Sequence, residues 1–136
     1  MIHDDIQDFA AALAPMTALA GLDLGERTIG VAVSDGLRQV ATPLETIRRK
    51  KFGVDAARLQ EILAKRAIGG VILGLPRNMD GSEGPRCQST RAFARNFSRL
   101  WDGPIGFWDE RLSTDHVAAS YILQGVLDRM RFLGEA

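Results

Sequence analysis

Asp23 is an acidic residue inside an apolar run, residues 18–24, of the kind that forms a buried strand. Burying a carboxylate without a partner costs free energy, so this position indicates a bound cation or another compensating group. Gly25 follows two residues later, and its missing side chain would let a phosphate approach the backbone closely. An isolated Asp-x-Gly is also typical of a tight turn, and these residues alone leave that interpretation open.

The elements around Asp23 are predicted by the alternation of side chains. A strand with period two places Leu19, Gly21 and Asp23 on one face, and a second strand over residues 28–34 continues after a short turn. The resulting hairpin has one bulky face and one face of small residues. A third extended segment, residues 40–47, completes an antiparallel meander.

The second half of the chain changes to a helical period. A helix begins near Val54 and is expected to close at Gly69-Gly70, and the apolar residues 71–75 predict a strand covered on both faces. A loop (76–84), a long helix, a strand (105–108) and a final helix follow. The fold class is therefore α/β, with the order βββαβαβα and a mixed five-stranded sheet.

Length and composition indicate one domain. The chain has 136 residues, 46% of them hydrophobic and 25% charged, and a net charge of +0. We expect residues 1–17 to form an N-terminal extension with a short helix, and residues 18–136 to form the domain. The sequence shows no membrane span and no signal peptide, and Cys87 is its one cysteine, so a cytoplasmic location is expected.

Two local groups of cations stand out against the neutral total. One is the run of residues 48–51, and the other is a stripe of Arg91, Arg95 and Arg99 along one helix face. The simplest interpretation of the stripe is the solvated face of an amphipathic helix.

Three ordered motifs, residues 21–35, 74–86 and 108–114, together resemble the YqgF/RuvX family of the ribonuclease H-like superfamily. Members of this family are described as Holliday junction resolvases and as nucleases that process the 5′ end of pre-16S ribosomal RNA. The resemblance implies a ribonuclease H-like fold and a metal-dependent hydrolase that acts on phosphodiester bonds. Processing of pre-16S rRNA is the favoured function, and junction resolution is the alternative.

The resemblance also implies a two-metal site for Mg²⁺ or Mn²⁺. Asp23 would bridge both ions, Glu110 would hold one, and Asp115 would complete the site from the final helix. Asp109 is the alternate to Glu110, because successive residues of a strand point to opposite faces. Asp115 could also cap the helix that follows it, and the two roles are compatible.

A polar loop and its neighbours are the expected substrate contacts. Asn78 to Arg86 precede a long helix whose first amides could bind a phosphate, although the same residues could form a capped turn. The expected substrate-binding residues are Gly25, Arg27, Asn78, Asp80, Ser82, Arg86 and Arg111. The partners would be precursor ribosomal RNA, or branched DNA, and ribosomal particles. No membrane partner is expected, and a monomer is favoured over a dimer.

The chain departs from the family pattern at three places. Glu26 would add a carboxylate near the metals, and Arg77 would add a phosphate contact. Relatives also carry a helix and a basic stretch where Thr114 is here followed directly by Asp115. Either that element is lost or the sequence as given omits a loop, and omission is the interpretation that we favour.

Two other classes of protein remain as alternatives. Actin-like ATPases and sugar kinases share the Asp-x-Gly hairpin, but they clamp a nucleotide between two such domains and this chain offers one. A non-catalytic RNA- or ribosome-binding module could keep the fold without the activity.

Overall fold

The computed structural model describes residues 1–111 and 118–134. In chain order its elements are β1 (Ile2–His3), α1 (Ile6–Ala11), β2 (Ala18–Leu24), β3 (Thr28–Ser34), β4 (Ala41–Arg48), α2 (Phe52–Lys65), β5 (Ile68–Arg77), α3 (Pro85–Ser98), β6 (Ile105–Arg111) and α4 (Ala119–Phe132). None of these helices has the length and apolar character needed to cross a lipid bilayer.

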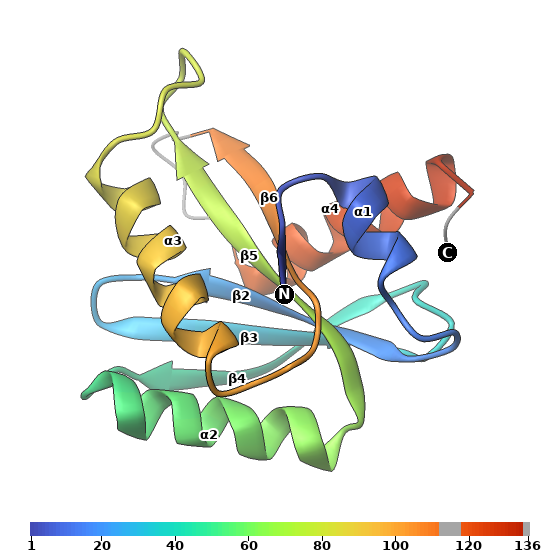
Figure 1. Ribbon diagram of the computed structural model, residues 1–136, viewed down its shortest axis with the longest axis horizontal. Helices are drawn as coiled ribbons and strands as arrows, with labels where there is room; N and C mark the ends of the chain where they lie inside the picture. The colour runs from blue at the N-terminus through green and yellow to red at the C-terminus, as the bar shows by residue number, and fades with distance from the viewer. Residues whose placement is uncertain (112–117, 135–136) are drawn as a thin grey trace.

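One mixed sheet organises the molecule, with the strand order β1-β6-β5-β2-β3-β4 (Figure 1). The strands β2, β3 and β4 form the predicted antiparallel meander, while β5 runs parallel to both β2 and β6. The prediction of five strands was wrong by one, because Ile2 and His3 add a sixth strand beside β6. Two residues are too few for any periodicity to reveal, and this strand exists only through its pairing.

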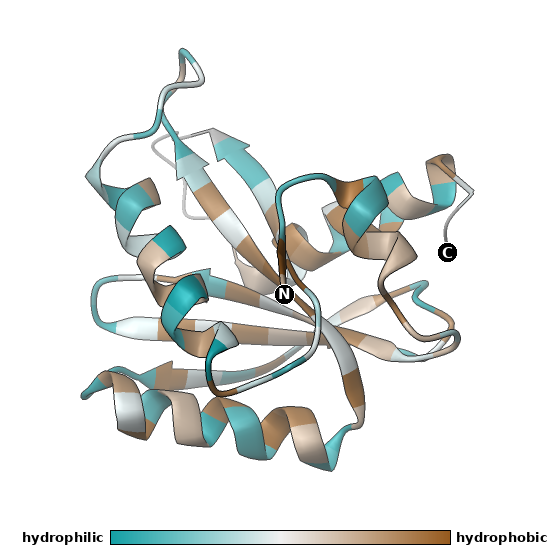
Figure 2. Cartoon of the chain, viewed as in Figure 1, coloured by the Kyte–Doolittle hydropathy of each residue, from teal (hydrophilic) through white to brown (hydrophobic). Residues whose placement is uncertain are grey.

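Helices cover both faces of the sheet, and each face has its own hydrophobic core. The helices α2 and α3 pack on the face formed by Leu22, Val31 and Leu73. The opposite face contacts α1 and α4 through Leu19, Ala32, Ile72 and their neighbours. Figure 2 shows hydrophobic colour along the middle of the sheet and hydrophilic colour at the carboxyl ends of β5 and β6.

The small-residue face predicted for the hairpin lies under α4. A Cβ on Gly21 would lie 2.7 Å from the Cβ of Leu123, and a Cβ on Gly74 would lie 2.5 Å from Cδ1 of Ile122. Glycine at these positions allows α4 to pack almost directly on the backbone of β2 and β5. The first turn of α4 is thereby held beside the carboxyl end of β2, where Asp23 lies.

The sequence predicted that Gly69-Gly70 ends a helix, and this prediction was wrong. The helix α2 ends at Lys65, Ala67 takes the positive φ of 52°, and both glycines lie inside β5. A Cβ on Gly70 would lie 2.5 Å from Leu13 and 2.9 Å from Phe9. These glycines therefore serve close packing of the N-terminal segment rather than termination of a helix.

Candidate active site

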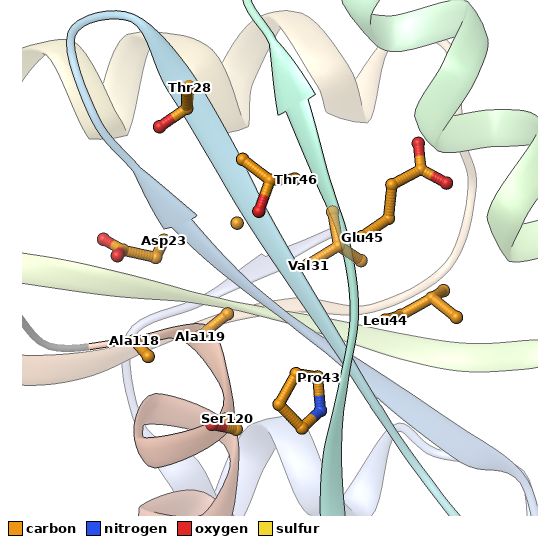
Figure 3. A pocket seen from close by; sticks show the side chains of 11 residues that line it. Asp23, Thr28, Val31, Pro43, Leu44, Glu45, Thr46, Ala118, Ala119 and Ser120 are labelled. Atoms are coloured by element: carbon orange, nitrogen blue, oxygen red, sulfur yellow. The ribbon is translucent and has the colours of Figure 1, made fainter.

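Asp23 lies one residue before the end of β2 and opens onto a groove of about 420 Å³. Figure 3 shows its carboxylate at this groove, together with Thr28, Thr46 and the first residues of α4. Gly30 pairs with Asp23 across the hairpin, and a Cβ there would lie 3.6 Å from the Cβ of Asp23. The small residue leaves the space beside the carboxylate open.

Glu110 shares this face of the sheet with Asp23. The strand β5 lies between them, with Gly74 paired to Trp108 and Pro76 paired to Glu110. A Cβ on Gly74 would lie 3.7 Å from Cγ of Glu110, so Glu110 leans over a position without a side chain. Ile122 of α4 occupies the space above Gly74, so Asp23 on β2 and Glu110 on β6 lie on either side of β5.

The electrostatics of Glu110 show this proximity. Burial raises the pKa of the Glu110 carboxyl above its usual value, and the charges of Asp109 and Asp23 act in the same direction. A hydrogen bond from the indole N–H of Trp108 opposes these effects. A carboxylate with these surroundings is stabilised when a cation is bound beside it.

Asp109 points to the opposite face, as the alternation of a strand requires. It is exposed, and its Oδ1 lies 3.9 Å from Nε of Arg77. Arg77 also approaches Glu83, with 3.4 Å between Nη2 and Oε2. The cation expected to contact a phosphate is thus close to two carboxylates.

Two carboxylates on one face of the sheet, separated by the strand β5, fit a hard divalent cation, which prefers oxygen ligands and retains several waters. Within residues 1–111 and 118–134, no group of three or more potential metal-binding side chains occurs. The third expected ligand, Asp115, lies outside the described residues, as does the junction between Thr114 and Asp115.

The loop after β5 forms an internally hydrogen-bonded turn. The Nδ2 group of Asn78 donates to Oγ of Ser82 at 3.0 Å, and both the amide and the hydroxyl of Ser82 donate to Oδ1 of Asp80, at 2.9 and 2.6 Å. The structure therefore brings these three expected substrate-binding residues together. Their contact with substrate stays a prediction.

Two of the remaining expected substrate contacts, Gly25 and Arg86, lie at a different groove from Asp23. Gly25 and Arg86 line a second groove, together with Glu26 and Arg49. Glu26, which was expected near the metals, lines this second groove and not the Asp23 groove. Arg27 is exposed in this turn, and Arg111 is the last residue of β6.

Sequence reasoning placed Arg49 in a cationic run that could bind nucleic acid but did not name it as a site residue, and it missed the ion pairs of Arg91 on α3. Arg91 donates from Nε and Nη2 to the two oxygens of Glu83, each at 2.7 Å, and from Nη1 to Asp4 at 2.8 Å. One arginine of the expected solvated stripe is thus largely buried and paired, while Arg95 and Arg99 are exposed. The run of cations at residues 48–51 was the signal that could have identified Arg49.

Comparison with known proteins supplies the family. The model of the family RuvX, described as Holliday junction resolvase, matches residues 17–116. A protein from a Ruegeria species (strain TM1040) that carries the name "Putative pre-16S rRNA nuclease" is 67% identical, over 98% of this chain and 98% of its own. The protein of the same name from Ruegeria pomeroyi is 63% identical, over 98% of this chain and 100% of its own.

The alignments extend over 154 positions, more than the 136 residues of this chain, so these relatives have residues without a counterpart here. Among solved structures, Thermus thermophilus RuvC superimposes with a TM-score of 0.56 at 13% identity, covering 88% of this chain and 98% of that one. This likeness shows the ribonuclease H-like fold alone. The match of the RuvX model to most of the chain, with two relatives above 60% identity over nearly their full length, shows that this chain belongs to the RuvX family.

Proposed function

We propose that this protein is a divalent-metal-dependent nuclease that hydrolyses phosphodiester bonds at the 5′ end of pre-16S ribosomal RNA. The observation that carries the proposal is the placement of Asp23 and Glu110 on one face of the sheet, on either side of β5, where the charge of Asp23 acts on Glu110 and Asp23 lines an open groove. Family membership and the names of the relatives support the same activity and substrate.

Asp23 and Glu110 would hold Mg²⁺ or Mn²⁺, and Asp115 is proposed as the third ligand. A bound divalent cation makes a water nucleophilic near neutral pH and neutralises charge on the phosphate and the leaving oxygen. The two carboxylates would hold the cations near the carboxyl ends of β2 and β6, and Gly30 leaves room beside Asp23 for a phosphate. The hydrogen bond from Trp108 would help to hold the Glu110 carboxylate in one orientation.

RNA is the favoured substrate because the two relatives are named as pre-16S rRNA nucleases. A resolvase makes paired cuts in a four-way junction and needs a symmetric dimer, whereas we favour a monomer. We propose a monomer that acts on precursor RNA, free or in ribosomal particles, in the cytoplasm.

The test incubates the protein with Mg²⁺ or Mn²⁺ and a labelled pre-16S rRNA fragment, beside a labelled four-way DNA junction. We expect metal-dependent cutting of the RNA, which Asp23→Asn and Glu110→Gln each reduce more than about 100-fold because they remove a ligand oxygen's charge. Asp109→Asn is the matched control, since this exposed carboxylate points to the opposite face. Cutting of the junction alone would instead favour a resolvase, and binding of RNA without cutting would favour a non-catalytic module.

A further inference from the structure

A second groove lies on the α3 side of the β2–β3 hairpin end, across the sheet from the Asp23 groove. It has a volume of about 350 Å³, and its polar lining comes from Gly25, Glu26, Arg49, Arg86, Ser89 and Thr90. In Figure 1 the β2–β3 turn, the start of α2 and the start of α3 gather at the left edge of the molecule. The lining of this groove thus begins at Leu24, the residue directly after Asp23.

The cations around this groove have no carboxylate partner among the described residues. Arg49 and Arg86 line it, and the neighbouring turns carry Arg27, Arg48, Lys50 and Lys51, none of them in an ion pair within residues 1–111 and 118–134. Arg58 and Arg91, by contrast, each pair with two carboxylates. Glu26 is the single carboxylate of the lining, so the groove has an excess of positive charge.

Arg49 is held in place by the hairpin turn itself. Its Nη1 donates to the carbonyl oxygen of Gly25 at 2.6 Å, and its backbone amide donates to the carbonyl oxygen of Arg27 at 2.8 Å. Its Nε and Nη2 groups make no hydrogen bond to the described part of the chain. A guanidinium fixed at one nitrogen and open at the others is well suited to bind a phosphate.

We propose that this groove binds the phosphate backbone of a single-stranded nucleic acid, next to the bond that is cut. The strand passes from the Asp23 groove around Gly25, which has no side chain to obstruct it, and contacts Arg49 and Arg86. A single strand turns around a hairpin end easily, whereas bending a DNA duplex, with a persistence length of about 150 base pairs, costs several kcal/mol. This inference rests on the proposed function for the location of the cut, whereas the binding itself requires no catalysis.

The experiment measures binding of a labelled single-stranded RNA by fluorescence anisotropy, in the presence of a chelator so that no cutting occurs. Arg86→Ala should raise the Kd roughly three- to tenfold and reduce the slope of log Kd against log salt by about 0.7, the value for one phosphate contact on a single strand. Ser89→Asp, an exposed residue that places a negative charge in the groove, should weaken binding at least as much. Arg99→Ala removes an equal charge from the exposed far end of α3 and should change neither quantity.

Unchanged Kd and salt slope in both groove variants would overturn the proposal. An equal effect on a perfect RNA duplex would overturn its single-strand part. If the wild-type protein cuts no substrate while the two groove variants still weaken binding, the proposed nuclease function fails and the binding groove stands. Where cutting is observed, Arg86→Ala should raise KM and leave kcat unchanged, and a fall in kcat alone would contradict a role in binding.

Discussion

The orientation of Glu110 depends on two residues that carry no metal-binding group, Trp108 and Gly125. Trp108 donates a hydrogen bond to the Glu110 carboxylate. Trp108 can lie against α4 because of Gly125, where a Cβ would lie 2.8 Å from the indole ring and 3.0 Å from Nε1. The orientation of one candidate ligand therefore depends on the packing between α4 and β6.

Trp108→Phe should weaken metal binding while keeping the fold. The phenyl ring fills most of the space but has no N–H to donate to Glu110, and loss of such a supporting hydrogen bond typically costs about 10- to 100-fold in metal affinity or activity. The measurement is the Mg²⁺ concentration that gives half-maximal cutting, or Mn²⁺ affinity by calorimetry. Trp101→Phe is the control, because Trp101 stacks on Phe97 on the other face of the sheet. An equal loss in both variants would point to a general packing effect.

The sequence named Asp23 as a candidate ligand by its apolar surroundings and Glu110 by the family resemblance, and it did not name Trp108. An acidic residue inside an apolar run is a local signal, and the alternation of a strand correctly separates Asp109 from Glu110. The pairing of Trp108 with Gly125 joins β6 to α4, and neither residue has a pattern around it that predicts this contact. The clustering of Arg49 with Arg86 is equally long-range, since it depends on the way two turns meet.

At the scale of elements, the close contact of α4 with the sheet determines the shape of the Asp23 groove. Ala118, Ala119 and Ser120 form one wall of that groove and begin the helix. The helix can approach this closely because Gly21 faces the Cβ of Leu123 and the carbonyl oxygen of Ala119.

Gly21→Ala should destabilise the protein by about 1 to 3 kcal/mol, because the added Cβ meets backbone and the base of a side chain rather than a flexible end. Gly53→Ala is the matched control, since Gly53 lies in α2 with nothing within 4 Å of an added Cβ, and it should stabilise the protein by up to about 1 kcal/mol. Urea unfolding of both variants measures the difference. Equal stability of the two would contradict the tight packing of α4 on β2.

The periodicity of hydrophobic residues predicts the central strands of the sheet. It fails for short elements that are stabilised only by their contacts with distant parts of the chain. The hairpin and β5 have strong patterns and were predicted correctly. The strand β1 has two residues, and Gly69-Gly70 suggested an ending because a glycine pair is usually a breaker. The structure shows the role of the two glycines, because Thr17 packs on Gly69, and Leu13 and Phe9 pack on Gly70.

The ion pairs of Glu83 should make stability depend on pH. Hydrogen bonds from Arg91, then the charges of Arg91 and Arg77, hold the pKa of Glu83 below its ordinary value. The stabilisation is therefore present above the pKa of the unfolded chain, near 4.3, and is lost as the pH falls through the lowered folded value. Glu83→Gln should lower Tm at pH 7 and match the wild type at strongly acidic pH. A difference in Tm that stays constant from pH 7 to strongly acidic pH would contradict this linkage. The control is Glu61→Gln, at an exposed carboxylate, whose Tm should stay close to that of the wild type at both pH values.

At the scale of the whole molecule, the N-terminal segment is part of the core although the family model begins only at residue 17. Phe9 is fully buried and packs on the glycines of the sheet, with 2.8 Å between its ring and a Cβ on Gly106. Asp4 pairs with Arg91 on α3, and β1 extends the sheet beside β6. We propose residues 18–136 as the nuclease domain, with the N-terminal extension as its stabilising cover.

Phe9→Ala should cost about 3 to 5 kcal/mol of unfolding free energy, the range for truncation of a buried phenylalanine. Gln7→Ala on the exposed side of the same helix should change stability by less than about 0.5 kcal/mol. Chemical denaturation followed by circular dichroism gives both values. A loss below 1 kcal/mol for Phe9→Ala would show that the extension is dispensable for folding.

Cys87, the single cysteine of the chain, is fully buried in the first turns of α3, and burial raises the pKa of its thiol. A thiol reagent can modify it only when this part of α3 separates from the sheet, so the labelling rate measures how often that opening occurs. The same turns carry Arg86 and Ser89 on their exposed side. The protein thus contains its own built-in probe, and RNA bound along these turns should slow the labelling of Cys87.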